Sequence, residues 1–205
     1  MNELQRQFPD LPDWEKLYQQ QQVESMPWYN PILDTDLEQA LKKLKLERGT
    51  ILDIGTGPGT QAIALAQRGF RVTATDISET AIAKAKNQAQ AKGLNIFFQT
   101  DDILDTRIEG KFDFVFDRGC FHVLPPERRQ TYVDTVHGLI VTQGYLFLKC
   151  FSHLETREGG PYRFTPEQIR EVFGDRFQVI SIEETAYQGT LDPPPKALFC
   201  ILQKY

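Results

Sequence analysis

The sequence predicts an α/β protein with a doubly wound, seven-stranded sheet that closes with a C-terminal antiparallel β-hairpin. Three observations support this fold class. Short apolar runs alternate with helical patterns along most of the chain, and a glycine-rich turn joins the first run, 50–54, to a helix. The last two runs, 177–184 and 197–203, are separated by a proline-rich loop that is too short for a crossover helix. These two strands must therefore pair antiparallel.

The N-terminal part of the chain is expected to be helical. A first helix is expected from Asp13 to about Ser25. A second is expected over 37–44, because apolar residues recur there at the spacing of one helix face. Neither helix belongs to the alternating pattern of strands and helices that follows.

Five βα units follow, and small residues mark the ends of their elements. Gly69 and Gly93 are placed to end helices, and Thr60, Ser78 and Thr165 are placed to cap the starts of helices. Strands are expected at 50–54, 70–75, 96–99, 112–116 and 144–150, and helices at 60–68, 78–92, 126–139 and 166–173.

Composition excludes several classes of partner. A chain of 205 residues suits one domain, and a net charge of −5 with a pI near 5.3 gives no basic face for nucleic acid. There is no apolar run long enough for a membrane span and no secretion signal. Three cysteines and three histidines lack the spacing of metal ligands. We expect a cytoplasmic protein, a monomer or weak homodimer, with no metal, nucleic-acid or membrane partner.

The glycine turn carries the strongest chemical signal. Gly55, Gly57 and Gly59 stand at every second position and give the pattern G-x-G-x-G. A dinucleotide fingerprint is instead G-x-G-x-x-G, and it holds a pyrophosphate at the start of the helix. Asp53 precedes this turn, and a carboxylate there repels a pyrophosphate and attracts a cationic group. The pattern therefore fits S-adenosylmethionine, which carries an ammonium and a sulfonium and no phosphate. A dehydrogenase with the same sheet is the disfavoured alternative.

The motif DIGTGPG, the acid Asp76 at the end of the second strand, and the terminal hairpin resemble the Rossmann-like class I S-adenosylmethionine-dependent methyltransferases from Thr50 onward. The resemblance implies that Asp76 contacts the ribose and that Asp101 and Asp102 contact the adenine edge, with S-adenosylhomocysteine as product. The cofactor-binding residues expected in this way are Tyr18, Trp28, Asp53, Gly55, Thr56, Gly57, Gly59, Asp76, Ile77, Asp101, Asp102, Ile103 and Asp117.

Other segments narrow the resemblance. MPWYN at 26–30, FDRGCFHVLPPERR at 116–129 and GGPYRFTPEQIREVF at 159–173 look like the thiopurine methyltransferase superfamily, which includes tellurite-resistance and halide/thiol methyltransferases. This implies an aromatic N-terminal lid, so we expect residues 1–45 to form a helical lid and residues 46–205 to form the cofactor-binding core of a single domain.

The methyl acceptor is expected to be a small molecule with a soft or anionic nucleophile, such as a thiol. Arg118 is a candidate to hold an anionic acceptor, and His122 and His153 are further catalytic candidates because they follow strand ends. Since no side chain is an obvious general base, a thiol is favoured, because it ionises with little help. A hydroxyl or amine acceptor, and a protein that binds the cofactor without turnover, remain alternatives.

Overall fold

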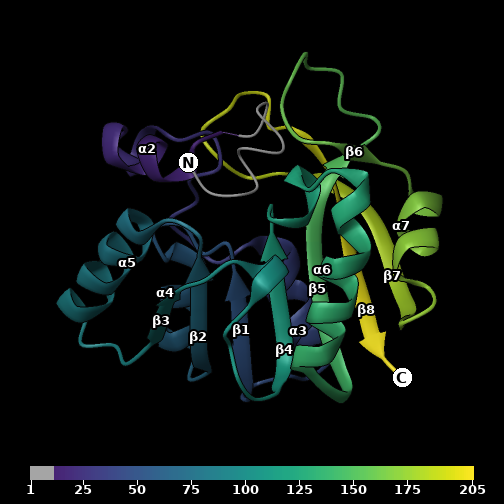
Figure 1. The fold of residues 1–205 in the computed structure, drawn as a ribbon, viewed down its shortest axis with the longest axis horizontal. Coiled ribbons are helices and arrows are strands. Elements are labelled where there is room, and N and C mark those ends of the chain that lie inside the picture. The colour runs from purple at the N-terminus through teal and green to yellow at the C-terminus, as the bar shows by residue number, and fades with distance from the viewer. Residues whose placement is uncertain (1–11) are drawn as a thin grey trace.

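The structure is a computed structural model that describes residues 12–205. Its centre is a mixed sheet with strand order β3-β2-β1-β4-β5-β8-β7, and β6 pairs with the end of β5 (Figure 1). The strands are β1 Thr50–Ile54, β2 Arg71–Asp76, β3 Phe97–Thr100, β4 Phe112–Arg118, β5 Ile140–Ser152, β6 Arg163–Phe164, β7 Phe177–Ala186 and β8 Lys196–Lys204. The helices are α2 Trp14–Gln20, α3 Thr35–Lys43, α4 Thr60–Gln67, α5 Glu79–Ala91, α6 Pro126–Leu139 and α7 Pro166–Phe173, with 3₁₀ turns η1 Val23–Ser25, η2 Ile103–Asp105 and η3 Phe121–Val123.

The sheet has the expected doubly wound topology. β1 pairs in parallel with β2 on one side and with β4 on the other, so the chain reverses its direction of winding between β1 and β4. β8 pairs antiparallel with both β5 and β7, which confirms the C-terminal hairpin. In open α/β sheets, ligands bind outside the carboxyl ends of the strands at such a reversal.

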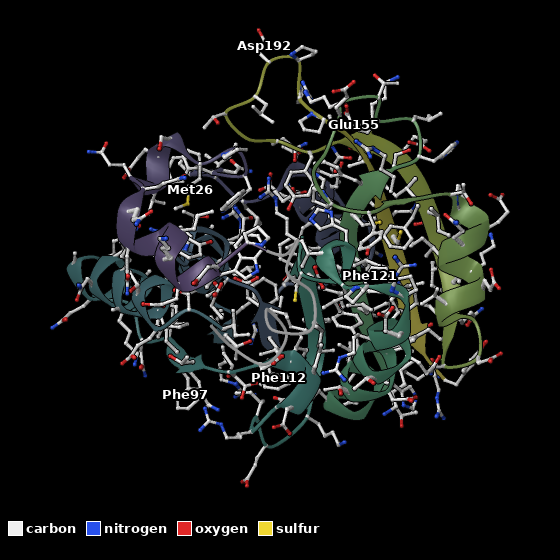
Figure 2. All side chains as sticks on the ribbon, turned by 45° about the horizontal axis from the view of Figure 1, so that its top comes forward. Met26, Phe97, Phe112, Phe121, Glu155 and Asp192 are labelled. Carbon is white, nitrogen blue, oxygen red and sulfur yellow. The ribbon has the colours of Figure 1, made fainter. Side chains whose placement is uncertain are left out.

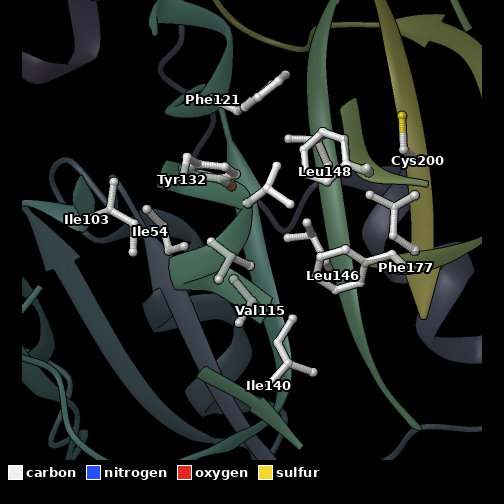
Figure 3. Packing of buried hydrophobic residues seen from close by; sticks show 14 of the residues in the cluster. Ile54, Ile103, Val115, Phe121, Tyr132, Ile140, Leu146, Leu148, Phe177 and Cys200 are labelled. Carbon is white, nitrogen blue, oxygen red and sulfur yellow. The ribbon is translucent and has the colours of Figure 1, made fainter. Parts of the chain in front are cut away.

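Two apolar clusters cover the two faces of the sheet, because side chains of a strand alternate between faces. In β5, Leu146 and Leu148 face α6 and α7, whereas Phe147 faces the layer that contains α3, α4 and α5. Figure 3 shows the first cluster, in which Phe121 and Tyr132 lie beside the side chains of β5. The sheet is therefore buried on both faces, and its ends remain for a site. No helix of the described residues is long and apolar enough to cross a membrane.

Most predicted elements are confirmed, and α6 and α7 begin and end where the sequence placed them. Ser78 caps α5 and Thr165 caps α7 through their side chains, as expected. The cap expected at Thr60 is wrong: α4 begins after Gly59, whose φ of 81° is left-handed, and Thr60 is the first helical residue.

Three further differences have local causes. The third βα unit lacks an α-helix, because Asp102 caps only the short turn η2. β5 starts at Ile140, directly after α6 and four residues before the expected start, and it includes Gln143 with a φ of 63°. The N-terminal helix ends at Gln20 because Gln21 is extended, and the rest of the expected helix is the turn η1.

Two glycines with similar backbones test how tightly α4 packs on α5. A Cβ on Gly59 would lie 2.7 Å from the Cβ of Ala85, whereas a Cβ on Gly69 would meet nothing within 4 Å. Both Gly59→Ala and Gly69→Ala force alanine into the left-handed region, at about 1–2 kcal/mol. Gly59→Ala should lose a further ~1–3 kcal/mol to overpacking in urea unfolding of the cofactor-free protein. Equal losses of stability in the two variants would show that α5 shifts to make room for the added Cβ on Gly59.

Candidate active site

A cavity of about 1100 Å³ lies at the carboxyl ends of β1, β2 and β4, between these strand ends and the N-terminal segment. In Figure 1, α2, the loop before β6 and the yellow loop between β7 and β8 all gather over this end of the sheet. A smaller cavity adjoins it at the glycine turn. Predicted site residues that line the larger cavity are Tyr18, Trp28, Gly55, Asp76, Ile77, Asp101, Asp102, Ile103, Arg118 and His122, and Asp53, Thr56 and Gly57 line the smaller one.

The glycine turn needs glycine at two positions. Gly55 and Gly57 have φ values of 64° and 53°, which other residues rarely adopt. A Cβ on Gly57 would lie 2.6 Å from the hydroxyl oxygen of Tyr18, and one on Gly55 would lie 3.3 Å from the Cβ of Cys120. The bare backbone of the turn therefore borders both cavities, as expected from the sequence.

Asp53 is a buried carboxylate without a cationic partner. Its Oδ2 accepts a hydrogen bond of 2.5 Å from the Thr56 hydroxyl, and its side chain borders the smaller cavity. Burial raises the pKa of Asp53 to about 7, and the Thr56 hydrogen bond only partly opposes that rise. A ligand ammonium beside Asp53 would supply the missing counter-charge.

The other acids at this edge hold loops as well as facing the cavity. Asp76 accepts hydrogen bonds from the backbone N–H groups of Gly57 at 2.8 Å and Ser78 at 2.9 Å, and burial raises its pKa to about 6. Asp101 accepts from the Thr106 hydroxyl at 2.6 Å, and Asp102 caps η2. Asp53, Asp76, Asp101 and Asp102 gather at this edge, and the one cation that lines both cavities with them in the described residues, Arg118, is paired with Asp34. This arrangement fits a cationic ligand without phosphate, as S-adenosylmethionine is.

Three predicted site residues lie outside both cavities. Asp117 is fully buried, and its oxygens accept from the N–H groups of Gly119, Cys120 and Phe121 and from the Tyr132 hydroxyl. Asp117 therefore anchors the turn after β4 and does not line the cavity, although the resemblance placed it among the cofactor-binding residues. Gly59 packs on α5, and His153 has an exposed side chain beside Glu184, so neither borders the cavity.

Arg118 has other partners than the anionic acceptor expected from the sequence. Its Nε lies 3.0 Å from Asp34 Oδ2, its Nη1 donates to the Trp28 carbonyl at 2.9 Å, and its Nη2 donates to the Gln188 carbonyl. The side chain is only 7% exposed. Arg118 therefore fastens the N-terminal segment and the β7–β8 loop to the end of β4.

His122 is buried and neutral. The Phe151 N–H donates to its Nδ1 at 3.2 Å, and its ring stacks on Tyr187 at 5.8 Å. Burial, helped by the charge of Arg118, lowers the pKa of His122 to about 3, so its imidazole is uncharged and only a weak base at neutral pH. The catalytic role expected for His122 must be one that a neutral imidazole can perform.

Sequence reasoning missed a buried ion network beside Arg118. Lys149, near the carboxyl end of β5, is fully buried, and its Nζ lies 2.8 Å from Asp34 and 2.6 Å from Asp36. Burial raises the pKa of Asp34, but Lys149 and Arg118 outweigh it, so the net shift is downward. The signal in the sequence was a lysine inside the apolar run GYLFLKC, although nothing there named its partners.

The N-terminal segment is fixed to the core at several other points. Glu15 of α2 accepts from the hydroxyl groups of Ser78 and Thr80 at the start of α5, and the Lys84 ammonium donates to the Tyr18 carbonyl. Although burial opposes the change, the hydrogen bonds from Ser78 and Thr80 lower the pKa of Glu15 to about 2. Trp28 meets the rings of Trp14 and Tyr18 edge to face, which places three aromatic rings over the cavity.

Loops from the other half of the sheet complete the rim of the cavity. Glu155 accepts from the backbone N–H groups of Arg157 and Lys196, each at 2.7 Å, and so joins the loop before β6 to the start of β8. Figure 2 shows Glu155 under the β7–β8 loop, with Asp192 at the outer tip of that loop. The described residues contain no group of three or more His, Cys, Asp or Glu side chains that could hold a metal ion.

The ion network predicts a large stability difference between two lysines. Lys149→Met should destabilise the protein by about 3–5 kcal/mol, because Asp34 and Asp36 would lose their buried cation. Lys42, whose side chain is 75% exposed beside Glu38, is the matched control, and Lys42→Met should change stability by less than about 0.5 kcal/mol. Urea unfolding measures both, and a loss below about 1 kcal/mol for Lys149→Met would refute the importance of the network.

Comparison with known proteins agrees with this geometry. Residues 51–144 match the family described as "Methyltransferase domain". An uncharacterised methyltransferase of Schizosaccharomyces pombe is 33% identical over 103 residues, which are 50% of this chain and 71% of that protein. Thiocyanate methyltransferase 1 of Arabidopsis thaliana is 27% identical over 177 residues, which are 85% of this chain and 77% of that one.

Solved structures share the fold. A protein studied for the conversion of a disulfide bond into a thioacetal group during echinomycin biosynthesis superposes with a TM-score of 0.81 at 23% identity, covering 93% of this chain and 91% of that one. TehB from Haemophilus influenzae superposes with a TM-score of 0.71 at 20% identity, covering 84% of this chain and 63% of that one. The family match, the S. pombe relative and the acidic site at the glycine turn lead to the same conclusion. The chain belongs to the class I S-adenosylmethionine-dependent methyltransferases.

Proposed function

We propose that this methyltransferase acts on a small molecule whose nucleophile is a thiol or another soft atom. The observation that carries the proposal is that His122, Arg118 and Cys120, which line the cavity beyond the glycine turn, do not provide a strong base. There, His122 is neutral, Arg118 is occupied by Asp34, and burial raises the pKa of the Cys120 thiol. An acceptor that is already ionised in water does not need a base.

The walls around the acceptor space support the same proposal. Val123, Leu124, Phe151, Tyr162 and Leu191 line this part of the cavity with apolar and aromatic groups. S-adenosylmethionine supplies a methyl group on a positively charged sulfur, and the charges of a thiolate and a sulfonium neutralise each other during transfer. A dry, apolar site therefore favours the transfer by such a pair.

Thiocyanate methyltransferase 1 is consistent with a soft acceptor, but other relatives carry out other chemistries: a ubiquinone biosynthesis O-methyltransferase of Coxiella burnetii is 30% identical over 152 residues. The proposal that this chain falls with the thiopurine, tellurite-resistance and halide/thiol group rests on the sulfur-related relatives named above and on the D-R-G turn at Asp117. A hydroxyl or amine acceptor is the alternative that the experiment below separates.

We assign the cofactor contacts as follows. Asp53 would hold the ammonium group, because it is a buried acid without a cation, and Asp76 would hold the ribose hydroxyls. Asp101 and Asp102 would face the adenine, with Ile77 and Ile103 as its apolar neighbours. Tyr18 and Trp28 would cover the cofactor, so the segment up to residue 45 would act as the lid of the core at 46–205. The described part of that segment begins at residue 12.

Asp53→Asn should weaken S-adenosylmethionine binding about 10- to 100-fold, because a charge-assisted contact is worth about 1.5–3 kcal/mol. The same change should stabilise the cofactor-free protein at pH 8. Folded Asp53 titrates at about 7, well above its ordinary value of 3.8, so above pH 7 the fold must bury a charge. This penalty shrinks as pH falls below 7 and is gone only below about 3.8. Calorimetry and urea unfolding measure the two effects.

The matched control for this test is Asp105→Asn, because Asp105 is exposed and lies at the end of η2. It should change neither cofactor affinity nor stability. In the wild-type protein, cofactor affinity should rise between pH 6 and pH 8 as Asp53 ionises. Unchanged affinity for S-adenosylmethionine in Asp53→Asn would show that Asp53 does not contact the cofactor.

The acceptor proposal predicts an order of reactivity among compounds that share one carbon skeleton. Thiophenol should be methylated at least about tenfold faster than phenol, aniline or benzoate, because a thiol is already partly ionised at neutral pH. A competition assay with labelled S-adenosylmethionine measures the ratio. Preference for the phenol or the amine would refute the soft-nucleophile proposal, and labelling of protein or nucleic acid would refute a small-molecule acceptor.

A further inference from the structure

His122 has one ring nitrogen bound to the protein and one that is not. Its Nδ1 accepts the Phe151 N–H at 3.2 Å. A neutral imidazole carries one proton, so this hydrogen bond places the proton on Nε2 and makes Nε2 a donor. Within residues 12–205, no group accepts a hydrogen bond from Nε2, although the residue is only 4% exposed and lines the larger cavity.

The approach to Nε2 from the cavity is open because residue 119 is glycine. A Cβ on Gly119 would lie 3.0 Å from Nε2 and in close contact with the Tyr187 hydroxyl. Gly119 also has a φ of 105°, which favours glycine. The bare backbone at this position therefore leaves a space in front of the donor.

The ring itself is held in place on both sides. Tyr187 stacks on it with ring centroids 5.8 Å apart, and Phe151 meets its edge at 5.0 Å. Tyr187 is fixed in turn, because its hydroxyl donates to the Arg118 carbonyl at 2.6 Å. A donor held in this way needs little rearrangement to meet a developing or existing negative charge.

We propose that His122 donates a hydrogen bond from Nε2 to the methyl acceptor at or beside its nucleophilic atom, and that it thereby selects acceptors that enter without a proton on that atom, namely thiolates. This inference rests on the proposed function. The acceptor's lone pair forms the new bond to carbon, the bonding pair of the broken bond stays on the departing sulfur, and the imidazole proton stays on Nε2. The thiol proton is lost to water before binding.

The groups around the ring fit a donor and not a base. Tyr187 faces the ring from the loop after β7, and Arg118, at the end of β4, carries a charge held by Asp34. β5 contributes Phe151, which does not ionise. At saturating S-adenosylmethionine, the rate should therefore depend on pH through the ionisation of the acceptor and not through His122.

A matched pair of substitutions separates the two ring nitrogens. The side-chain oxygen of His122→Asn can take the place of Nδ1 and keep the Phe151 hydrogen bond, but this variant has no group at the position of Nε2. His122→Gln can place an amide N–H near the position of Nε2. With thiophenol, kcat/KM should fall at least about tenfold in His122→Asn and recover substantially in His122→Gln, while the Kd of S-adenosylmethionine stays unchanged in both.

A second measurement uses the wild-type protein and does not depend on any variant. Ring-substituted thiophenols with different pKa values should each give a pH profile of kcat/KM whose midpoint follows the pKa of that thiol. One midpoint shared by all thiols, or wild-type kcat/KM in His122→Asn, would overturn the role of His122 while thiol methylation still stands. Absence of thiol methylation in the wild-type protein, with turnover on an amine or phenol, would overturn the proposed function and this inference together.

Discussion

The buried ion network of Asp34, Arg118 and Lys149 is the interaction on which the site depends. It joins the N-terminal segment to the ends of β4 and β5, and Arg118 extends it to the β7–β8 loop through Gln188. Buried charges are tolerated only when they are paired, so these residues have one stable arrangement. That arrangement fixes two residues that line the cavity, because the Arg118 guanidinium donates to the Trp28 carbonyl and the Arg118 carbonyl accepts from the Tyr187 hydroxyl.

The network also determines the charge that the cavity presents to ligands. It occupies Arg118 and Lys149 with acids of its own, so neither cation forms an ion pair with Asp53, and the charge of Arg118 only partly opposes the rise in the pKa of Asp53. Asp53 and Asp76 are then left with only neutral hydrogen-bond donors, and burial raises the pKa of both. A buried acid in this state lowers stability and increases affinity for a cationic ligand, which is a common trade between stability and function.

Local signals in the sequence were enough for the elements and for the glycine turn. α7 begins where Thr165 and Gln168 form a capping box, and β8 follows the proline-rich loop as expected. The partners of Lys149 could not be predicted in this way, because Asp34 lies 115 residues away. The same holds for Arg118: its position at the end of a strand was correctly predicted, but its partners depend on how the N-terminal segment folds back over the sheet.

Burial acts in opposite directions on the two kinds of titratable group in the cavity, and this explains its chemistry. It raises the pKa of Asp53 to about 7 and lowers that of His122 to about 3, so both residues tend towards the uncharged form. Because Arg118 is already paired with Asp34, the charges that change during the reaction are then those that the ligands bring. A cationic methyl donor and an anionic acceptor suit such a site, because their opposite charges disappear as the methyl group is transferred. A neutral amine would instead acquire a positive charge beside the neutral His122, which offers it a hydrogen-bond donor and no counter-charge.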